Sequence, residues 1–145
     1  MAKNKRVPRR LEDKTVPQLI KRLDTVFAKY VKRYWSLDGM YVKCYTCGKQ
    51  LTLGERNTQA GHFISRSYSA TRFDEDNVRP QCGSPCNDKR YGNGMPIEFE
   101  ANLRNEIGEA KVESLKEKAR ANHKWDRAWL IEKIKHYDQR VAEIN

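Results

Sequence analysis

Four cysteines form two close pairs that could hold a metal ion. Cys44 and Cys47 enclose two residues, Cys82 and Cys86 enclose three, and 34 residues separate the two pairs. Such pairs are typical of a tetrahedral site in which four thiolates bind zinc. Because four protein ligands leave no position open for a substrate, this zinc would be structural. The alternatives are four unrelated buried cysteines, or disulfides, which the missing secretory signal disfavours.

A histidine and two asparagines lie between and directly after the cysteine pairs. Histidine titrates near neutrality, so His62 could act as the general base that activates a water molecule. Asn87 directly follows Cys86, and an amide oxygen is a hard ligand suited to Mg²⁺ or Mn²⁺. The alternative for His62 is a structural role. Asn77 lies in an Asp-rich loop, where it could simply form a turn.

The order and spacing of these residues resemble a known family. The chain is similar to the NinG/Rap recombination endonucleases of lambdoid bacteriophages, which have a ββα-metal (HNH, or His-Me finger) nuclease core with zinc knuckles. The likeness spans roughly residues 40–110. It is carried by the segments AGHFISR, RFDEDNVRPQC, CND and EFEANLRNEIG.

The resemblance implies a metal-dependent, structure-specific DNA endonuclease that acts on branched recombination intermediates such as D-loops and Holliday junctions. It implies that His62 is the general base, that Asn77 holds the His62 ring by a hydrogen bond, and that Asn87, at the start of a helix, binds the catalytic metal. Many relatives carry an Asp as a second metal ligand where this chain has Gly61. The candidates to replace that Asp are Glu98 first, and then Asp74 and Asp76.

The basic residues predict a polyanionic partner. The net charge is +10, and most of it lies in residues 1–35, which favours nucleic acid. Around His62 we expect DNA phosphates to contact Arg66, Arg72, Arg79, Lys89 and Arg90. Each of these side chains could instead be solvated or paired with a nearby acidic residue (Asp74, Glu75, Asp76 or Asp88), and the basic N-terminus could be a solubilising tail.

The patterning predicts an α+β fold, in which a small zinc-stabilised ββα-metal core is flanked by helices. Hydrophobic residues make up 38% and charged residues 33% of the chain, so only a modest core is expected. We divide the chain into a disordered basic arm (1–14), an amphipathic helix (15–37), a nuclease core (40–95) and a helical extension (96–145).

Local signals place the elements within these segments. Thr15 and Gln18 form a capping-box pattern, and apolar residues then recur at helical spacing as far as Tyr34. The segment 40–94 has short apolar runs between turn residues, which predicts short strands and one short helix after Cys86. Beyond residue 96 we expect three helices, with a stop at Gly108.

The sequence also bears on the expected location, the oligomeric state and the alternative functions of the protein. The chain lacks an apolar run long enough to span a membrane, so we expect a soluble protein. The resemblance implies that it acts in the cytoplasm of a phage-infected or lysogenic bacterium. Symmetric cutting of two strands would require two active sites, which a homodimer would provide. The alternatives are a non-catalytic zinc-stabilised module that binds nucleic acid and an HNH nuclease that cuts ordinary duplex DNA.

Overall fold

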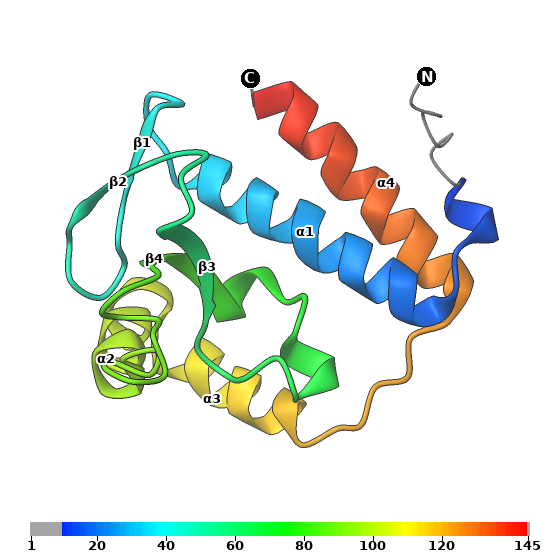
Figure 1. Ribbon diagram of the computed structural model, residues 1–145. Helices are drawn as coiled ribbons and strands as arrows, with labels where there is room; N and C mark the ends of the chain where they lie inside the picture. The colour runs from blue at the N-terminus through cyan, green and yellow to red at the C-terminus, as the bar shows by residue number, and fades with distance from the viewer. Residues whose placement is uncertain (1–9, 145) are drawn as a thin grey trace.

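The computed structural model describes residues 10–144 and combines helices with small antiparallel sheets (Figure 1). The α-helices of this part are α1 (Val16–Tyr34), α2 (Pro96–Ile107), α3 (Glu109–Ala119) and α4 (Arg127–Ile144). Two hairpins pair β1 (Tyr41–Lys43) with β2 (Gln50–Thr52) and β3 (Thr58–His62) with β4 (Val78–Cys82). The expected α+β class is confirmed, whereas residues 1–9 of the basic arm lie outside the described residues.

Helix α1 begins at the capping box that the sequence predicts. The Gln18 backbone N–H donates to the Thr15 hydroxyl at 3.3 Å, and the Thr15 N–H donates to Gln18 Oε1 at 2.9 Å. These bonds satisfy donors that the first helical turn leaves open. The helix ends at Tyr34, short of the expected residue 37, because the Asp38 carboxylate accepts the Met40 N–H at 2.8 Å and turns the chain.

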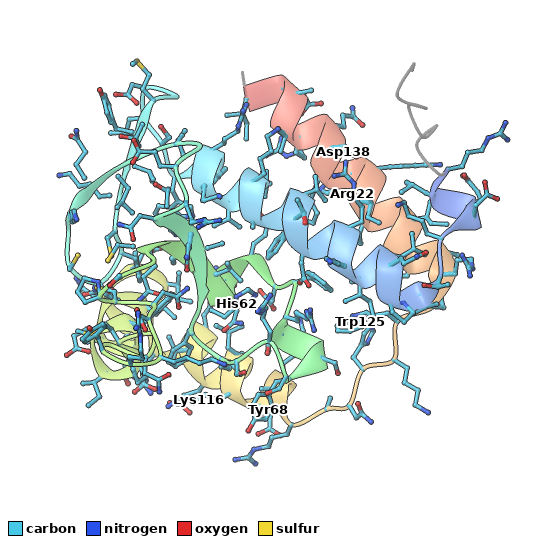
Figure 2. The ribbon with its side chains drawn as sticks, viewed as in Figure 1. Arg22, His62, Tyr68, Lys116, Trp125 and Asp138 are labelled. Carbon is cyan, nitrogen blue, oxygen red and sulfur yellow. The ribbon has the colours of Figure 1, made fainter. Side chains whose placement is uncertain are left out.

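The contact between α1 and α4 forms the main core, and the two helices lie side by side in Figure 1. The rings of Phe27 and Tyr137 pack edge to face with centroids 5.0 Å apart. At the surface Arg22 and Asp138 link the same two helices by an exposed ion pair at 3.3 Å (Figure 2). The apolar spacing in α1 is therefore used for packing. The fully buried residues of this core are Leu19 and Leu23 of α1, Leu130 and Ile134 of α4, and Val78 of β4.

The β3–β4 hairpin carries His62, Arg79 and Cys82, three of the residues that the sequence singled out. Its register places His62 opposite Val78 at one end and Thr58 opposite Cys82 at the other. All five residues of β4 are buried, and α1 packs against both strands. The Tyr45 N–H donates to the Pro80 carbonyl at 2.9 Å, which attaches the loop after β1 to β4. One small sheet therefore supports both the histidine and the cysteines.

The prediction of a short helix after Cys86 is wrong, because the chain folds back in turns there. The Gly92 N–H donates to the Pro85 carbonyl at 2.9 Å, and the Gly94 N–H donates to the Cys86 carbonyl at 2.7 Å. A Cβ atom at Gly92 would lie 2.6 Å from the Cys86 carbonyl oxygen, so this close return requires glycine. The next helix, α2, begins only at Pro96.

The C-terminal part follows the expected three-helix pattern. Gly108, with φ at +89°, separates α2 from α3, a backbone conformation that glycine adopts without strain. These two helices form a separate small core from Phe99, Leu103 and Val112. Within residues 10–144, none of the helices has the length and apolarity needed to cross a bilayer.

Candidate functional site

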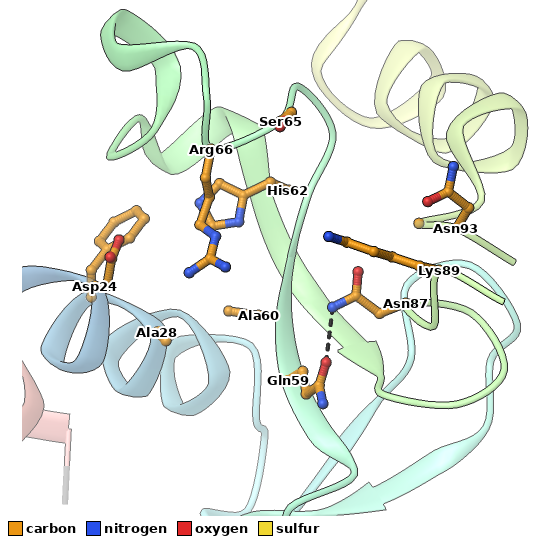
Figure 3. A pocket seen from close by; sticks show the side chains of 12 residues that line it. Asp24, Ala28, Gln59, Ala60, His62, Ser65, Arg66, Asn87, Lys89 and Asn93 are labelled. Carbon is orange, nitrogen blue, oxygen red and sulfur yellow. Dashed lines mark hydrogen bonds between the residues drawn. The ribbon is translucent and has the colours of Figure 1, made fainter. Parts of the chain in front are cut away.

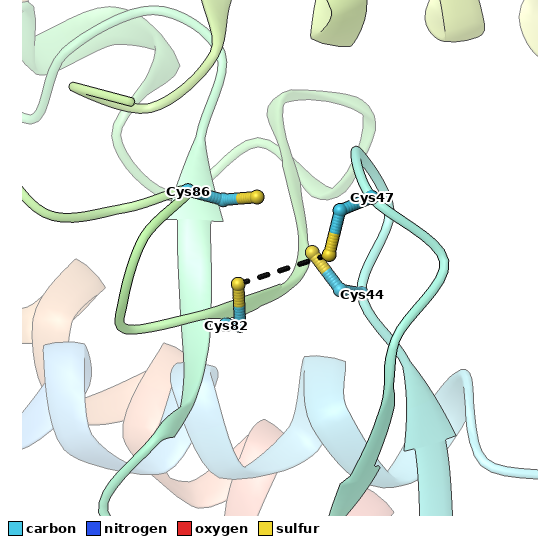
Figure 4. A group of neighbouring side chains, drawn as sticks. All are labelled: Cys44, Cys47, Cys82 and Cys86. Carbon is cyan, nitrogen blue, oxygen red and sulfur yellow. Dashed lines mark hydrogen bonds between the residues drawn. The ribbon is translucent and has the colours of Figure 1, made fainter. Parts of the chain in front are cut away.

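The four cysteines come together in a cluster that could bind a metal such as zinc (Figure 4). Their sulfur atoms all lie within 4.8 Å of one another, and Cys47 Sγ and Cys82 Sγ are 3.9 Å apart. Tetrahedral zinc with Zn–S bonds of about 2.3 Å requires sulfur atoms about 3.8 Å apart. The geometry therefore fits a four-thiolate metal site, and among residues 10–144 no other group of His, Cys, Asp and Glu side chains gathers in this way.

Two turns at strand ends position the cluster. After β1 the Cys44 N–H donates to the Lys49 carbonyl at 2.8 Å, and the Gly48 N–H donates to the Cys44 carbonyl at 2.9 Å. Gly48 has φ at +76°, a value that the tight turn requires. After β4 the Asn87 N–H donates to the Cys82 carbonyl at 3.0 Å and closes the second turn.

The electrostatics of the cluster favour a cation. Burial raises the pKa of Cys44, but hydrogen bonds from the Thr46 hydroxyl and backbone N–H groups outweigh this and lower it to about 6. Burial raises the pKa of Cys86 to about 12 and also raises that of Cys82. Crowded buried thiols cannot all ionise alone, so binding of a divalent cation would release protons from them.

A second candidate site is a polar cavity of about 580 Å³ around His62. Figure 3 shows its walls on either side of β3, with α1 opposite His62 and the turns after Cys86 beyond Asn87. Two cations, Arg66 and Lys89, line it together with one carboxylate, Asp24. Besides His62, the other polar side chains of its wall are Gln59, Ser65, Asn87 and Asn93.

His62 is held by the backbone of a neighbouring loop. Its Nε2 lies 3.0 Å from the Arg72 carbonyl oxygen. Because a carbonyl only accepts, this nitrogen carries the hydrogen, and Nδ1 of the neutral ring keeps a free lone pair. Burial lowers the pKa of His62 to about 4, against the opposing effect of the Arg72 carbonyl. At neutral pH the ring is therefore an uncharged base.

Asn77 does not bond the His62 ring, so that part of the expectation is wrong. Its fully buried side chain accepts the Ile64 N–H at 2.8 Å and donates to the carbonyls of Ile64 at 3.0 Å and Thr71 at 3.1 Å. Three bonds to backbone groups leave no atom aimed at the imidazole. Asn77 instead fixes the loop that joins β3 to β4, and this loop includes the carbonyl that holds His62.

Asn87 lies in the cavity but not at the start of a helix. Its Nδ2 donates to Gln59 Oε1 at 2.9 Å, and its oxygen points away from Gln59 (Figure 3). Glu98, in the exposed first turn of α2, lies outside the cavity wall. The other two candidate ligands are also elsewhere, because Asp74 pairs with Lys118 at 2.7 Å and Asp76 lines a different hollow.

Almost the whole chain matches one known protein family. A family model described as bacteriophage lambda NinG protein matches residues 2–145. This chain belongs to the NinG family. Neither the curated proteins nor the solved structures contain a match. The region matched by the NinG model includes the cysteine cluster, the cavity and the helices around them.

The glycine before His62 has a structural reason in this NinG-family chain. A Cβ atom on Gly61 would lie 2.1 Å from Gln81 Oε1, because the fully buried Gln81 side chain covers Gly61. Gln81 Nε2 donates to Thr46 Oγ1 at 3.0 Å and to the Gly94 carbonyl at 2.9 Å. Gln81 therefore fills the space that an aspartate at position 61 would need.

The five basic residues expected at DNA differ in their surroundings. The prediction that Arg79 contacts a phosphate is wrong. Its guanidinium is buried between Trp35 and Tyr45 and pairs with Glu106 at 3.0 Å. Arg72 is half-buried and bound to Asp24. Of the remaining three, Arg66 and Lys89 line the cavity, whereas Arg90 is exposed and pairs with Asp88 at 3.1 Å.

Sequence reasoning missed Asp24, Gln59 and Asn93 as residues of the cavity wall. Asp24 directly follows Leu23 in the apolar stripe of α1 and is half-buried. An acidic residue at the edge of a packing face is a signal that could have marked it. Gln59 and Asn93 carry no comparable signal, since their place depends on strand pairing and on the turns after Cys86.

Proposed function

We propose that this NinG-family protein is a metal-dependent endonuclease that hydrolyses phosphodiester bonds in DNA with His62 as general base. The observation that carries the proposal is the His62 ring, fixed through Nε2 by a carbonyl at 3.0 Å, in a cavity with two cations. A neutral imidazole with a free Nδ1 has the protonation state that a general base needs.

The residues of the cavity support the individual tasks of hydrolysis. His62 Nδ1 would take the proton of the attacking water, while Arg66 and Lys89 would hold the negatively charged phosphate. A water molecule would return a proton to the leaving 3′ oxygen. The Arg72 carbonyl would hold the orientation of the imidazole ring during the whole reaction.

A divalent cation fits the cavity only in part. Mg²⁺ or Mn²⁺ would supply Lewis-acid stabilisation of the phosphate, and the Asn87 amide oxygen is a suitable hard ligand. The only carboxylate in the wall among the described residues, Asp24, is engaged by Arg72. We therefore expect the free protein to bind Mg²⁺ weakly and the DNA phosphate to complete the ligand set.

A second hollow, of about 850 Å³, extends the basic surface along α1. Lys29 and Lys32 line it near the other end of β3, where Lys32 Nζ donates to the Thr58 carbonyl at 3.2 Å. Burial, with the nearby charge of Lys29, lowers the pKa of Lys32. Arg33 and one carboxylate, Asp38, also line the hollow. The lining therefore has a net positive charge that favours a phosphate, so we propose that DNA runs from the His62 cavity along α1 to this hollow.

The substrate class rests on the family resemblance. Branched recombination intermediates, D-loops and Holliday junctions, are the proposed substrates, and the cytoplasm of a phage-infected or lysogenic bacterium is the proposed location. The β3–β4 hairpin followed by α2 supports a ββα-metal core, although turns separate its strands from its helix. Paired cuts would require a homodimer, which light scattering at micromolar concentration would test.

The deciding experiment compares a labelled four-way junction with the matching linear duplex in Mg²⁺, Mn²⁺ and EDTA. We expect metal-dependent cleavage of the junction and a loss of about 10²–10⁴-fold in His62→Ala, with binding retained. His136→Ala is the matched control, because His136 is exposed on α4, away from the cavity. Equal cleavage of the duplex would indicate an ordinary HNH nuclease.

The second candidate function is a non-catalytic zinc-stabilised module that binds nucleic acid. It is favoured by the cavity wall, in which Asp24 is the one carboxylate among residues 10–144 and is already paired with Arg72. Tight binding of the junction without cleavage in any metal would support this function and reject the nuclease.

A further inference from the structure

The Arg72 side chain connects three parts of the chain next to His62. Its Nε donates to Asp24 Oδ1 at 3.0 Å and its Nη2 to Asp24 Oδ2 at 2.5 Å. Its Nη1 lies 3.5 Å from the Arg66 carbonyl oxygen. The guanidinium also lies 5.8 Å from the ring centroid of Trp125, in the segment before α4. One side chain thus joins α1, the loop after β3 and the segment before α4.

The same residue holds the imidazole, but through its backbone. The Arg72 carbonyl oxygen lies 3.0 Å from His62 Nε2 and accepts its hydrogen. A displacement of Arg72 would therefore move the acceptor that selects the His62 tautomer. The loop that carries Arg72 contains short 3₁₀ turns at Ser69–Thr71 and Glu75–Asn77, so side-chain anchors help to decide where this carbonyl lies. Asn77 is one anchor, through the Thr71 carbonyl. Asp24 is the other, through the Arg72 guanidinium.

The ion pair between Arg72 and Asp24 is unlike the pair between Arg22 of α1 and Asp138 of α4. Both carboxylate oxygens of Asp24 accept from Arg72, and the two side chains are only 20–21% exposed. Arg22 and Asp138 are 42% and 49% exposed. Bidentate, half-buried pairs fix geometry, whereas exposed pairs contribute little.

We propose that Asp24 is a positioning residue of the His62 site: it clamps the Arg72 guanidinium and so holds the Arg72 carbonyl on His62 Nε2. Its catalytic consequence rests on the proposed nuclease function, but its effect on the histidine does not. Through this chain of contacts, α1 sets the tautomer of a base that lies 38 residues further along the sequence.

The test uses the full-length zinc-loaded protein, with ¹⁵N-labelled histidine observed by NMR at pH 7. In the wild type we expect His62 as the single Nε2–H tautomer. In Asp24→Asn the carboxylate charge and one acceptor are lost, so we expect a mixture of tautomers at His62. Asp24→Glu keeps the bidentate acceptor and should restore the wild-type signals. Asp138→Asn removes an exposed partner on α4 and is the matched control, with no change expected.

Kinetics on the four-way junction give a second readout. We expect kcat to fall about 10-fold in Asp24→Asn with KM for DNA within about 2-fold, because base orientation and not phosphate binding is lost. If Asp24→Asn does not fold, Arg72→Lys replaces it, since lysine keeps the charge and the carbonyl but lacks the planar fork that holds both carboxylate oxygens in one fixed geometry.

The outcomes separate this inference from the proposed function. An unchanged His62 tautomer in both Asp24→Asn and Arg72→Lys would overturn it. An unchanged tautomer with a raised Mg²⁺ requirement in Asp24→Asn would also overturn it, and would make Asp24 a metal ligand instead. If the wild type cuts no DNA, the nuclease proposal fails, while the tautomer measurement still decides whether Asp24 positions His62.

Discussion

The cysteine cluster and the His62 cavity differ in how completely the chain itself builds them. The cluster gathers four soft donors within 4.8 Å, from two tight turns at strand ends. The cavity contains a neutral base, amide groups, two cations and one carboxylate that is already paired. The first region has a full ligand set for one ion, whereas the second leaves positions to be supplied from outside.

This difference separates a site suited to stabilising the fold from the site that we propose to be reactive. Four thiolates saturate a tetrahedral zinc ion, so the cluster can hold two turns together but cannot bind a substrate. An incomplete ligand set in a cavity of about 580 Å³ leaves room for water and a phosphate. The contrast predicts large effects on folding at the cysteines and smaller, more specific effects around His62.

The largest expected effect is the loss of the cluster. Structural zinc contributes about 10–16 kcal/mol of binding free energy in small domains, so Cys44→Ser or chelation should unfold the segment around residues 40–95. Hydrogen exchange should show lost protection there, while the α1–α4 core keeps part of its own. Adding Zn²⁺, but not Mg²⁺, should restore the chelated wild type. A chelated protein that stays folded and active would contradict a structural metal.

The next effect concerns pH. The folded-state pKa of His62 is about 4 because of burial, whereas in an unfolded chain histidine titrates near 6.5. Between these values the unfolded state binds more protons, so the free energy of unfolding should fall as pH drops from about 6.5 to about 4. The expected loss is up to about 3 kcal/mol at 1.36 kcal/mol per pKa unit.

About 2 kcal/mol of this loss should occur between pH 7 and pH 5. Urea denaturation at these two pH values measures it as the difference between wild type and His62→Gln. Protonation of the cysteine cluster affects both proteins equally and cancels in that difference. His136→Gln, at an exposed position, serves as the control. Equal pH dependence in wild type and His62→Gln would show that His62 is not buried as a neutral group.

A smaller effect is expected at the glycine before His62. In Gly61→Ala the new Cβ would lie 2.1 Å from Gln81 Oε1, and overpacking of this kind costs about 1–3 kcal/mol. Gln81→Ala leaves space there, so the double variant should lose less stability than the sum of the two single variants. Thermal unfolding of all four proteins measures the coupling, and strict additivity would contradict the contact.

The smallest expected effect is at the basic hollow. Replacing Lys29 and Lys32 with Ala should flatten the salt dependence of duplex binding by about 0.9 log unit for each phosphate that the protein no longer neutralises. Fluorescence anisotropy in EDTA measures it without cleavage. A control pair, Lys111 and Lys124, is exposed and outside the hollow. Equal slopes for the two double variants would remove this hollow from the DNA path.

The sequence by itself determined the features that depend on near neighbours. The capping box at Thr15, the stop at Gly108 and the apolar stripe of α1 are local patterns, and each is present in the structure. The cysteine spacing also predicted the two close pairs, because one short turn joins the members of each pair. The meeting of the two pairs in one cluster is a long-range contact, which the attachment of the loop after β1 to β4 makes possible.

Only the tertiary structure decided the surroundings of His62. Asn77 bonds backbone groups rather than the imidazole, Arg79 is buried against Glu106, and Asp24 reaches Arg72 across 48 residues. Each of these roles depends on which side chains meet when α1 packs on β3 and β4. Residue type and local spacing do not contain that information, because a polar side chain at a given position can be solvated, paired or buried depending on partners that are distant in sequence.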